Sequence, residues 1–419
     1  MTNAAVPSRS EAHAHCRFCS GPLAEFVDLG MSPLCESFLA SEQLNAMEPF
    51  YPLIARVCEN CFLVQLEEYV APVHIFTEYA YFSGFSDAWL NHARQYAAAM
   101  TEKLQLAASS LVIELGSNDG YLLQYFVQKG IRVLGIDPAA NVAKAAERRG
   151  VPTLVQFFDA DAARRLAEAG SKADLVVANN VLAQVPAVNS FVEGIRILLK
   201  PGAVCTIEVP HLLKTIAGNQ FDQIYHEHFS YFSASSVSRI FVQHGLRLFD
   251  VEELWTHGGS LRLYICHAHD EKWSTRPSVS ALLEKEEMAG LDRMETYASF
   301  AEEVRRTKRN LLSFLIDAKN RQKSVVGYGA PGKGNTLLNY CGVRTDFLDY
   351  TVDRNPHKHG KFLPGTHIPI FGPERIAETK PDYVLILPWN LKDEIMHQLA
   401  YVRGWGGQLV VPIPELVVS

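Results

Sequence analysis

Short apolar runs alternate with amphipathic stretches through the middle of this 419-residue chain, from about residue 76 to residue 310. Five aliphatic and β-branched runs, each separated from the next by a helical stretch, cover residues 111–115, 132–136, 153–156, 174–178 and 204–209. Strands that alternate with helices predict a parallel sheet with right-handed crossovers. Two further runs, 247–252 and 261–266, are joined by Thr256-His-Gly-Gly, a turn signal that predicts an antiparallel pair at the sheet edge.

A second, smaller α/β pattern covers residues 311–419. It begins with an apolar run at residue 324 that leads into a glycine-rich loop and a helix start, and further strands are predicted at 383–387 and 408–411. Before it, residues 280–321 are charged and helical in period, which predicts a linking segment whose solvated face includes Glu284-Lys-Glu-Glu.

Four of the eight cysteines form two identical Cys-x-x-Cys pairs within residues 1–75. The pairs are Cys16 with Cys19 and Cys58 with Cys61. A two-residue gap lets both thiolates bind one ion from a tight turn, and two pairs complete the tetrahedral set that structural zinc prefers. The alternative, four unrelated buried thiols, leaves the matched spacing unexplained. Four thiolates leave no open coordination position, so we expect the metal to be structural.

Composition and charge narrow the class of protein. With 48% hydrophobic residues, 20% charged residues and a net charge of −7, the chain gives no general reason to bind nucleic acid or an anionic membrane. No apolar run reaches the roughly 20 residues that span a bilayer, and residues 1–15 lack the pattern of a signal peptide. We therefore expect a cytoplasmic protein with reduced thiols, either a monomer or a weak dimer.

The loop after the first predicted strand, residues 114–120, reads Glu-Leu-Gly-Ser-Asn-Asp-Gly. Its glycines let the backbone approach a ligand at the carboxyl end of the strand, where open α/β sheets bind ligands. Asp137 ends the second strand, where it can accept hydrogen bonds from a ribose diol. The spacing Glu-x-Gly-x-Asn-x-Gly resembles the S-adenosylmethionine loop of methyltransferases. The predicted cofactor-binding residues are Glu114, Gly116, Asn118, Gly120, Asp137 and Asn179, the last of which alternatively caps the next helix.

The glycine loop of the second α/β pattern leaves the identity of its ligand open. Residues 327–332 read Gly-x-Gly-x-x-Gly, and Asp353 follows about 20 residues later, as in NAD-binding proteins. The loop also nearly matches a P-loop, but Gly334 replaces the hydroxyl residue that would hold magnesium. All of these interpretations place backbone N–H groups at a helix N-terminus beside Lys333, where they suit a diphosphate. The basic segment 357–367 either closes on those phosphates or forms a surface loop.

Residues 222–233 concentrate groups that transfer protons. The seven positions from Tyr225 to Tyr231 hold two histidines, one carboxylate and two tyrosines, which is typical of acid–base catalysis. The alternative is a polar loop whose aromatic side chains cover a core edge. The aromatic stretch 78–92, which includes Tyr79, leads into a helix predicted at 86–106 and either caps a core or closes over a ligand.

Together these motifs resemble the nucleotide-sugar C-methyltransferases, which build C-methyl branched deoxysugars. The likeness covers nearly the whole chain: the cysteine pairs, residues 114–120, Tyr-His-Glu-His at 225–228, and residues 328–336, 352–356, 363–367 and 385–390. It implies an α/β chain with a zinc-binding module at 1–75, a class I S-adenosylmethionine-dependent methyltransferase domain with a Rossmann-like fold at 76–310, and a Rossmann-like domain at 311–419 that binds a nucleotide diphosphate.

The resemblance implies methyl transfer to C3 of a nucleotide-linked 4-keto-6-deoxysugar through an enolate. His228 is then the base, Tyr225 and Glu227 support it, and His226 has a structural role. The glycine loop holds a sugar nucleotide in place of NAD. The implied substrate-binding residues are Tyr79, Gly329, Lys333, Gly334, Asn335, Asp353 and His359.

One position departs from the family pattern. Gln184 stands where the family carries a histidine, and an amide can hydrogen-bond but cannot transfer protons near neutral pH. The departure leaves open another S-adenosylmethionine-dependent reaction on a nucleotide sugar. An NAD-dependent oxidoreductase and a catalytically inactive sugar-nucleotide-binding protein are the remaining alternatives.

Overall fold

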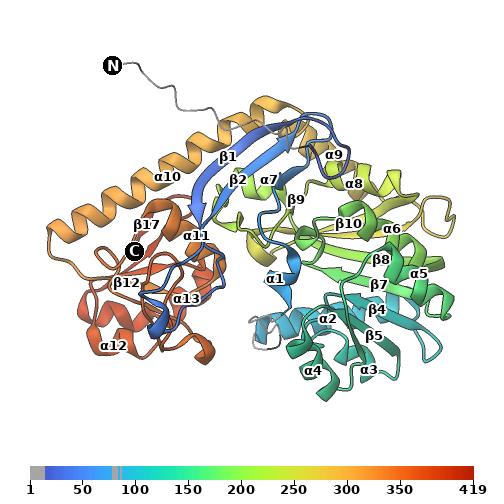
Figure 1. Cartoon of the computed structure of the whole chain (residues 1–419), viewed down its shortest axis with the longest axis horizontal. Coiled ribbons are helices and arrows are strands. Elements are labelled where there is room, and N and C mark those ends of the chain that lie inside the picture. The colour runs from blue at the N-terminus through green and yellow to red at the C-terminus, as the bar shows by residue number, and fades with distance from the viewer. Residues whose placement is uncertain (1–14, 78–83, 85–86) are drawn as a thin grey trace.

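The computed structural model describes residues 15–77, 84 and 87–419, which form two α/β lobes joined by a long helix and a small antiparallel sheet (Figure 1). The central lobe holds a seven-stranded sheet in the order β10-β11-β8-β7-β4-β5-β6. Neighbouring strands are parallel except β11, which is antiparallel to β8 and β10. The strands are β4 (Leu111–Leu115), β5 (Arg132–Asp137), β6 (Thr153–Val155), β7 (Ala173–Asn179), β8 (Leu199–Pro210), β10 (Leu246–Leu254) and β11 (Ser260–His267).

Helices cover both faces of the central sheet. Because successive side chains of a strand point to opposite faces, Val112 and Ile113 of β4 pack into two different cores. The Val112 face is covered by α2 (Asp87–Leu104) and α3 (Gln124–Val127), and the Ile113 face by α6 (Val188–Leu198) and α8 (Ala234–Gln243). Helices α4 (Ala140–Arg148) and α5 (Ala160–Glu168) lie in the remaining crossovers. All seven predicted strands are present, and the predicted α/β class is confirmed.

The N-terminal strands form an antiparallel sheet whose last strand comes from residues 222–233, the predicted acid–base stretch. Its order is β1 (Leu23–Ser32), β2 (Tyr51–Cys58), β3 (Val64–Leu66) and β9 (Ser230–Tyr231). The connection 33–50 contains η1 (Ser41–Gln43) and reaches the C-terminal lobe, where Leu39 forms a bridge with Phe362. The short helix α1 (Pro72–Phe76) follows β3. The N-terminal sheet therefore contacts both lobes.

The C-terminal lobe holds a six-stranded sheet in the order β14-β13-β12-β15-β16-β17. Its strands are β12 (Val325–Tyr328), β13 (Thr351–Val352), β14 (Ile370–Phe371), β15 (Tyr383–Ile386), β16 (Gln408–Val411) and β17 (Val417–Val418). All pairs are parallel except β16 with β17. The sequence pattern did not predict the three two-residue strands β13, β14 and β17. Helices α11 (Gly332–Cys341), α12 (Arg375–Thr379) and α13 (Lys392–Gln398) connect the strands.

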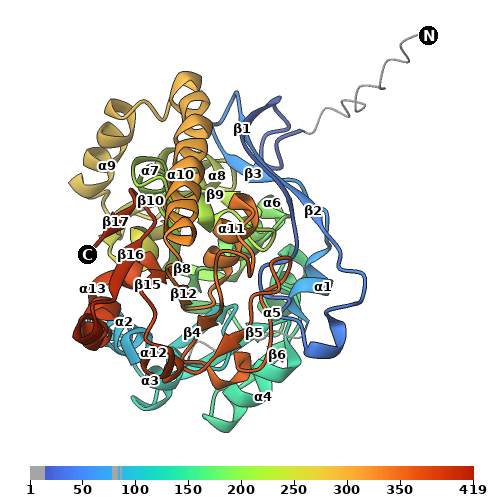
Figure 2. The ribbon, with the colours of Figure 1, turned by 90° about the vertical axis from the view of Figure 1, so that its left-hand side faces the viewer.

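The predicted linking segment forms two helices, α9 (Pro277–Met288) and α10 (Met294–Asn320). Gly290, at φ +80°, lies between them in the left-handed region, where a helix cannot continue. Helix α10 lies against β1 (Figure 1 and Figure 2), with Phe26 stacked on Phe300 at 4.5 Å between ring centroids. One core therefore joins the N-terminal sheet, α10 and the C-terminal lobe, and the domain boundaries at 75 and 310 stay predictions.

The predicted solvated face of this segment is wrong at Glu286, which is 1% exposed. Its carboxylate accepts hydrogen bonds from the backbone N–H groups of Ala234 and Ser235 at the start of α8, and it pairs with His211 at 2.8 Å. A buried carboxylate at a helix N-terminus satisfies donors that the helix itself leaves free.

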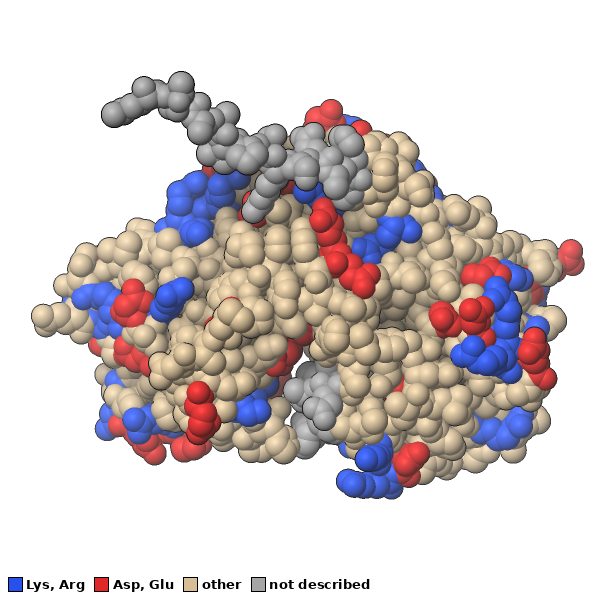
Figure 3. Space-filling view, viewed as in Figure 1, with Lys and Arg blue, Asp and Glu red and all other residues tan. Residues whose placement is uncertain are grey.

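The surface carries both signs of charge and is hollowed between the lobes on the face shown in Figure 3. On that face, the Lys and Arg side chains are interspersed with Asp and Glu side chains. Among the described residues, no helix combines the length and the apolar character needed to cross a membrane.

Candidate functional site

A cavity of about 650 Å³ lies between the carboxyl edge of the central sheet, the acid–base stretch and the start of α11. The predicted site residues that line it are Gly116, Asn118, Asp137, Asn179, Gln184, Tyr225, Glu227, His228 and Lys333. Those outside the lining are Glu114, Gly120, Gly329, Gly334, Asn335, Asp353 and His359. Tyr79 lies outside the residues that the structure describes. The cavity thus gathers both predicted centres, the cofactor loop and the acid–base stretch, in one space.

The loop after β4 is shaped for close approach of a ligand. Gly116 has φ +66°, and a Cβ on it would lie 2.3 Å from a methyl group of Val181, so only glycine fits without rearrangement. The Asp137 carboxylate accepts hydrogen bonds from the backbone N–H groups of Asn118 and Ala139, each at 2.9 Å. Burial raises the pKa of Asp137, and these two donors oppose the rise. The carboxylate therefore ties the loop to the end of β5.

Glu114 lies buried beneath this loop, 1% exposed. Within the described part of the chain, neither of its carboxylate oxygens has a hydrogen-bond partner. Burial, together with the charges of Asp137 and Asp119, raises the pKa of Glu114 well above its usual range. A buried acceptor without a partner is uncommon in native proteins and points to a proton or a cationic ligand group at this place.

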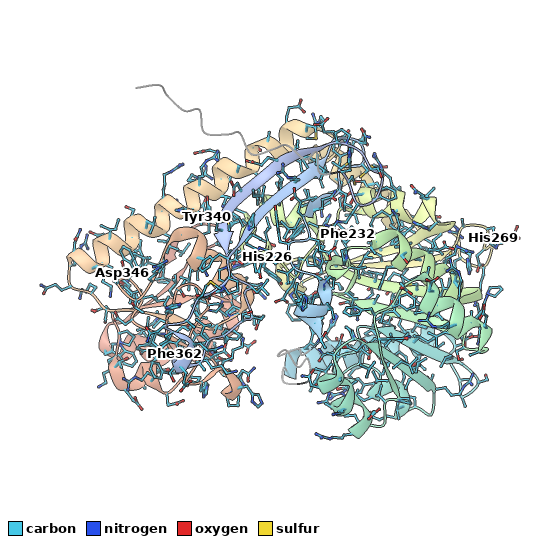
Figure 4. All side chains as sticks on the ribbon, viewed as in Figure 1. His226, Phe232, His269, Tyr340, Asp346 and Phe362 are labelled. Carbon is cyan, nitrogen blue, oxygen red and sulfur yellow. The ribbon has the colours of Figure 1, made fainter. Side chains whose placement is uncertain are left out.

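The acid–base stretch presents His228 to the cavity and turns His226 away from it. The His228 imidazole is 9% exposed and lies 4.2 Å from the Tyr225 ring, between ring centroids. Burial lowers the pKa of His228 to about 3, so its imidazole is neutral at pH 7, the form that can accept a proton, and it is a weaker base than an exposed imidazole. The His226 ring instead bonds the Pro52 carbonyl oxygen at 3.1 Å, beside β2 (Figure 4).

Glu227 and Cys35 meet at the cavity wall. The Cys35 thiol donates to a Glu227 carboxylate oxygen at 3.6 Å, and both side chains line the cavity. Burial, followed by the negative charge of Glu227, raises the pKa of Cys35 well above its usual range, so the thiol stays protonated. No local sequence pattern indicated Cys35, because its position depends on how the connection 33–50 crosses to the C-terminal lobe.

Lys333 belongs to a chain of contacts between the two lobes. Its ammonium donates to Asn390 at 2.9 Å and lies over the Trp389 ring, 4.9 Å from its centroid. The Trp389 indole N–H donates to Asp222 at 2.7 Å. Burial raises the pKa of Asp222 to about 6, and the charge of Lys333 opposes the rise. The acid–base stretch and the C-terminal lobe are therefore held in one arrangement at this edge of the cavity.

The predicted diphosphate cradle at the start of α11 already binds two carboxylates of the chain. The Gly332 N–H donates to Glu36, and the Ala330 N–H donates to Asp353 at 2.7 Å. The cations that line the cavity on this side are Lys333 and Lys358, the latter 3.9 Å from a Glu36 carboxylate oxygen. Side-chain ammonium groups, rather than these two backbone donors, are thus available to an anion here.

The four paired cysteines come together as the sequence predicted. Their sulfur atoms lie within 4.8 Å of one another, with 3.6 Å between Cys16 and Cys61 and 3.5 Å between Cys19 and Cys58. Zinc–sulfur bonds of about 2.3 Å in a tetrahedron require sulfur atoms roughly 3.8 Å apart. The arrangement therefore fits one tetrahedral zinc ion, and it packs into the core on the α6 and α8 face of the central sheet.

Comparison with known proteins assigns the family. Family models match residues 16–76 ("Putative zinc binding domain"), 89–251 ("Methyltransferase domain") and 255–414 ("C-methyltransferase C-terminal domain"). The C-methyltransferase NovU of Streptomyces niveus is 36% identical over 401 residues, which cover 96% of this chain and 95% of that protein. The chain belongs to the C-methyltransferase family. Membership confirms the predicted enzyme class, a methyltransferase dependent on S-adenosylmethionine, and the predicted zinc-binding module.

Solved structures resemble part of this C-methyltransferase. Magnesium protoporphyrin IX methyltransferase from Synechocystis, with bound SAH, is 16% identical, with 42% of this chain and 82% of that chain covered and a TM-score of 0.34. An S-adenosylmethionine-dependent methyltransferase from Clostridium acetobutylicum is 10% identical, with 42% and 91% covered and a TM-score of 0.32.

Proposed function

We propose that this C-methyltransferase transfers the methyl group of S-adenosylmethionine to C3 of a nucleotide-linked 4-keto-6-deoxysugar, through an enolate. The observation that carries the proposal is the single cavity, in which the Gly116 loop faces His228 and Lys333. A base, a cofactor loop and a cation suited to phosphate are the three parts that such a reaction needs, and all three line one space.

The residues around the loop fit the methyl donor. When bound, S-adenosylmethionine supplies an electrophilic sulfonium methyl group. Its ammonium group and ribose hydroxyls are hydrogen-bond donors, and Asp137 is the carboxylate acceptor in the cavity lining beside the loop. Glu114, whose oxygens have no partner among the described residues, lies just outside that lining. Phe157 and Phe158 add aromatic surface to the same wall of the cavity, which suits a purine ring.

The acid–base stretch fits proton removal from a carbon beside a ketone. His228 is neutral and faces the cavity, so it can take the C3 proton while the electron pair moves toward the C4 oxygen. Tyr225 and Glu227 line the cavity next to it, and Tyr225 stays a phenol because burial raises its pKa well above the usual range. Gln184 also faces the cavity and assists by hydrogen bonding alone.

Lys333 and Lys358 support a diphosphate at the other end of the cavity. Burial lowers the pKa of Lys333, and the negative charge of Asp222 opposes this, which favours an ammonium group. A second cation, Lys358, lies on the same side of the cavity. Two ammonium groups at one end suit the two phosphates of a nucleoside diphosphate.

We predict that substitutions at the two ends of the cavity separate the two ligands. Asp137→Ala should weaken S-adenosylmethionine binding and spare the sugar nucleotide, because it removes an acceptor beside the cofactor loop. Lys333→Ala should do the reverse, because it removes a charge beside the diphosphate. Calorimetry with each ligand alone measures both effects. Tight NAD binding that Lys333→Ala weakens would favour the oxidoreductase instead.

The direct test of the proposed function pairs each substrate with its reduced form. Nucleotide-linked 4-keto-6-deoxysugars should accept radiolabelled methyl groups from S-adenosylmethionine, and the matching 4-hydroxy sugars should not. Only the ketone can delocalise the charge left at C3. Equal transfer to both forms would point to another reaction on the nucleotide sugar.

A further inference from the structure

The tip of the β10–β11 hairpin forms part of the cavity wall. This tip, η5 (Thr256–Gly258), was predicted as a simple turn, but it places the His257 imidazole in the lining together with His228 and Lys333. The two imidazoles lie close enough for the charge of one to lower the pKa of the other. The proposed mechanism leaves His257 without a role.

The hairpin tip is held in place from several sides. His257 has φ +55°, a left-handed conformation that few residues other than glycine adopt and that recurs at functional sites. The Gly258 carbonyl oxygen accepts a hydrogen bond from Gln220 at 2.9 Å, and a Cβ on Gly258 would lie 2.6 Å from the Trp389 ring. The His257 ring itself meets Trp89 edge to face at 5.6 Å. The imidazole therefore has a fixed position, set by Trp89 of the central lobe, by Gln220 and by Trp389 of the C-terminal lobe.

The His257 ring is prepared to donate a hydrogen bond into the cavity. Burial, followed by the charge of Lys333, lowers the pKa of His257 to about 4, so the ring is neutral at pH 7 and carries one N–H group. Among the described residues, no hydrogen bond to either ring nitrogen is formed. A neutral imidazole is a suitable hydrogen-bond donor to an enolate oxygen. The pKa of its N–H group lies closer to the pKa of the enol than the pKa of an imidazolium does.

We propose that His257 is a catalytic residue that donates its N–H to the C4 oxygen of the bound keto sugar while His228 removes the proton at C3. The proposal rests on the proposed function. The C3–H bond breaks and its proton goes to the His228 imidazole. The electron pair forms a C3–C4 double bond, and the carbonyl pair moves onto the oxygen that His257 binds. The C3–C4 double-bond pair then forms the new bond from C3 to the methyl carbon, and the oxygen pair restores the C4 carbonyl. The electron pair of the broken S–CH₃ bond stays on sulfur.

The test uses variants chosen for the left-handed backbone at this position. Glycine and asparagine both tolerate a positive φ, so H257G and H257N keep the hairpin conformation, and only H257N keeps a side-chain donor. H257G should lower kcat about 10²–10³-fold with little change in KM, the usual effect of losing one donor to a developing oxyanion. H257N should retain part of the activity that H257G loses, and added imidazole should restore part of the activity of H257G.

Trp255→Ala is the matched control, because this hairpin side chain is 63% exposed and lies outside the cavity lining. It should turn over as the wild type does. Wild-type kcat in H257G would overturn the proposal, as would equal loss of kcat and melting temperature in H257G and H257N without rescue by imidazole. If the wild-type enzyme methylates no keto nucleotide sugar, the proposed function fails first and this proposal fails with it.

Discussion

His228→Asn should lose about 10²–10⁴-fold in turnover, the range expected when a general base is removed. The neutral His228 imidazole lines the cavity beside Tyr225, on the side of the acid–base stretch. Asparagine keeps similar bulk and a hydrogen-bonding group, but it cannot accept a proton near neutral pH. Both ligands should therefore still bind, while exchange of the C3 hydrogen with deuterated solvent should stop along with methyl transfer.

His226→Asn is the matched control for this prediction. His226 is also buried in the same stretch, but its ring bonds the Pro52 carbonyl oxygen and does not line the cavity. The control should lower the melting temperature and leave the solvent-exchange rate of folded enzyme near that of the wild type. Steady-state rates and proton exchange followed by NMR measure both variants. Wild-type turnover in His228→Asn would refute the assignment of His228 as the base and would make Tyr225 the next candidate.

Removal of one zinc ligand should unfold the N-terminal module. We expect Cys58→Ala to abolish stoichiometric zinc in the purified protein and to reduce the yield of folded chain sharply. Zinc binding to four thiolates contributes on the order of 10 kcal/mol in small zinc domains, which is as large as the whole stability of a typical domain. Because the Cys58 and Cys61 side chains belong to the core of the central lobe, the loss should extend beyond the module.

Cys205→Ala is the control for the zinc prediction. Cys205 is a fully buried thiol in β8, outside the four-cysteine cluster, so the variant removes the same atoms from a core without removing a zinc ligand. It should keep one zinc per chain and lose only the modest stability that a small cavity costs. Elemental analysis and thermal melting compare the two. Full zinc content and a wild-type melting temperature in Cys58→Ala would contradict a structural zinc site.

The residues that end predicted strands were the ones the sequence could place. The carboxyl ends of parallel strands meet at one edge of a sheet, so Gly116, Asp137 and Asn179 were expected near one another, and all three line the cavity. The cysteine cluster was predictable for a similar reason, since its geometry follows from local spacing. Both inferences depend on short stretches of chain whose structure is set by their own residues.

Residues placed by contacts between distant segments escaped prediction. Glu36 reaches α11 from the connection between β1 and β2, and His257 reaches the cavity from a hairpin tip. Neither residue lies in a local sequence pattern that indicates a site. Glu286 was assigned to a solvated face because its helix is highly charged, but the start of α8 packs over it. Pairing of β9 with β3 likewise depends on how the whole N-terminal sheet meets the central lobe.

The position of the transferred methyl group decides whether this enzyme methylates C3 of the sugar. The enzyme is supplied with S-adenosylmethionine carrying a ¹³C-labelled methyl group and with a nucleotide-linked 4-keto-6-deoxysugar, and the product is examined by NMR. We expect a methyl carbon bonded to C3 of the sugar ring, with the C3 proton lost to solvent in the same reaction. A labelled methyl group on oxygen, or on any ring carbon other than C3, would contradict C3 methylation.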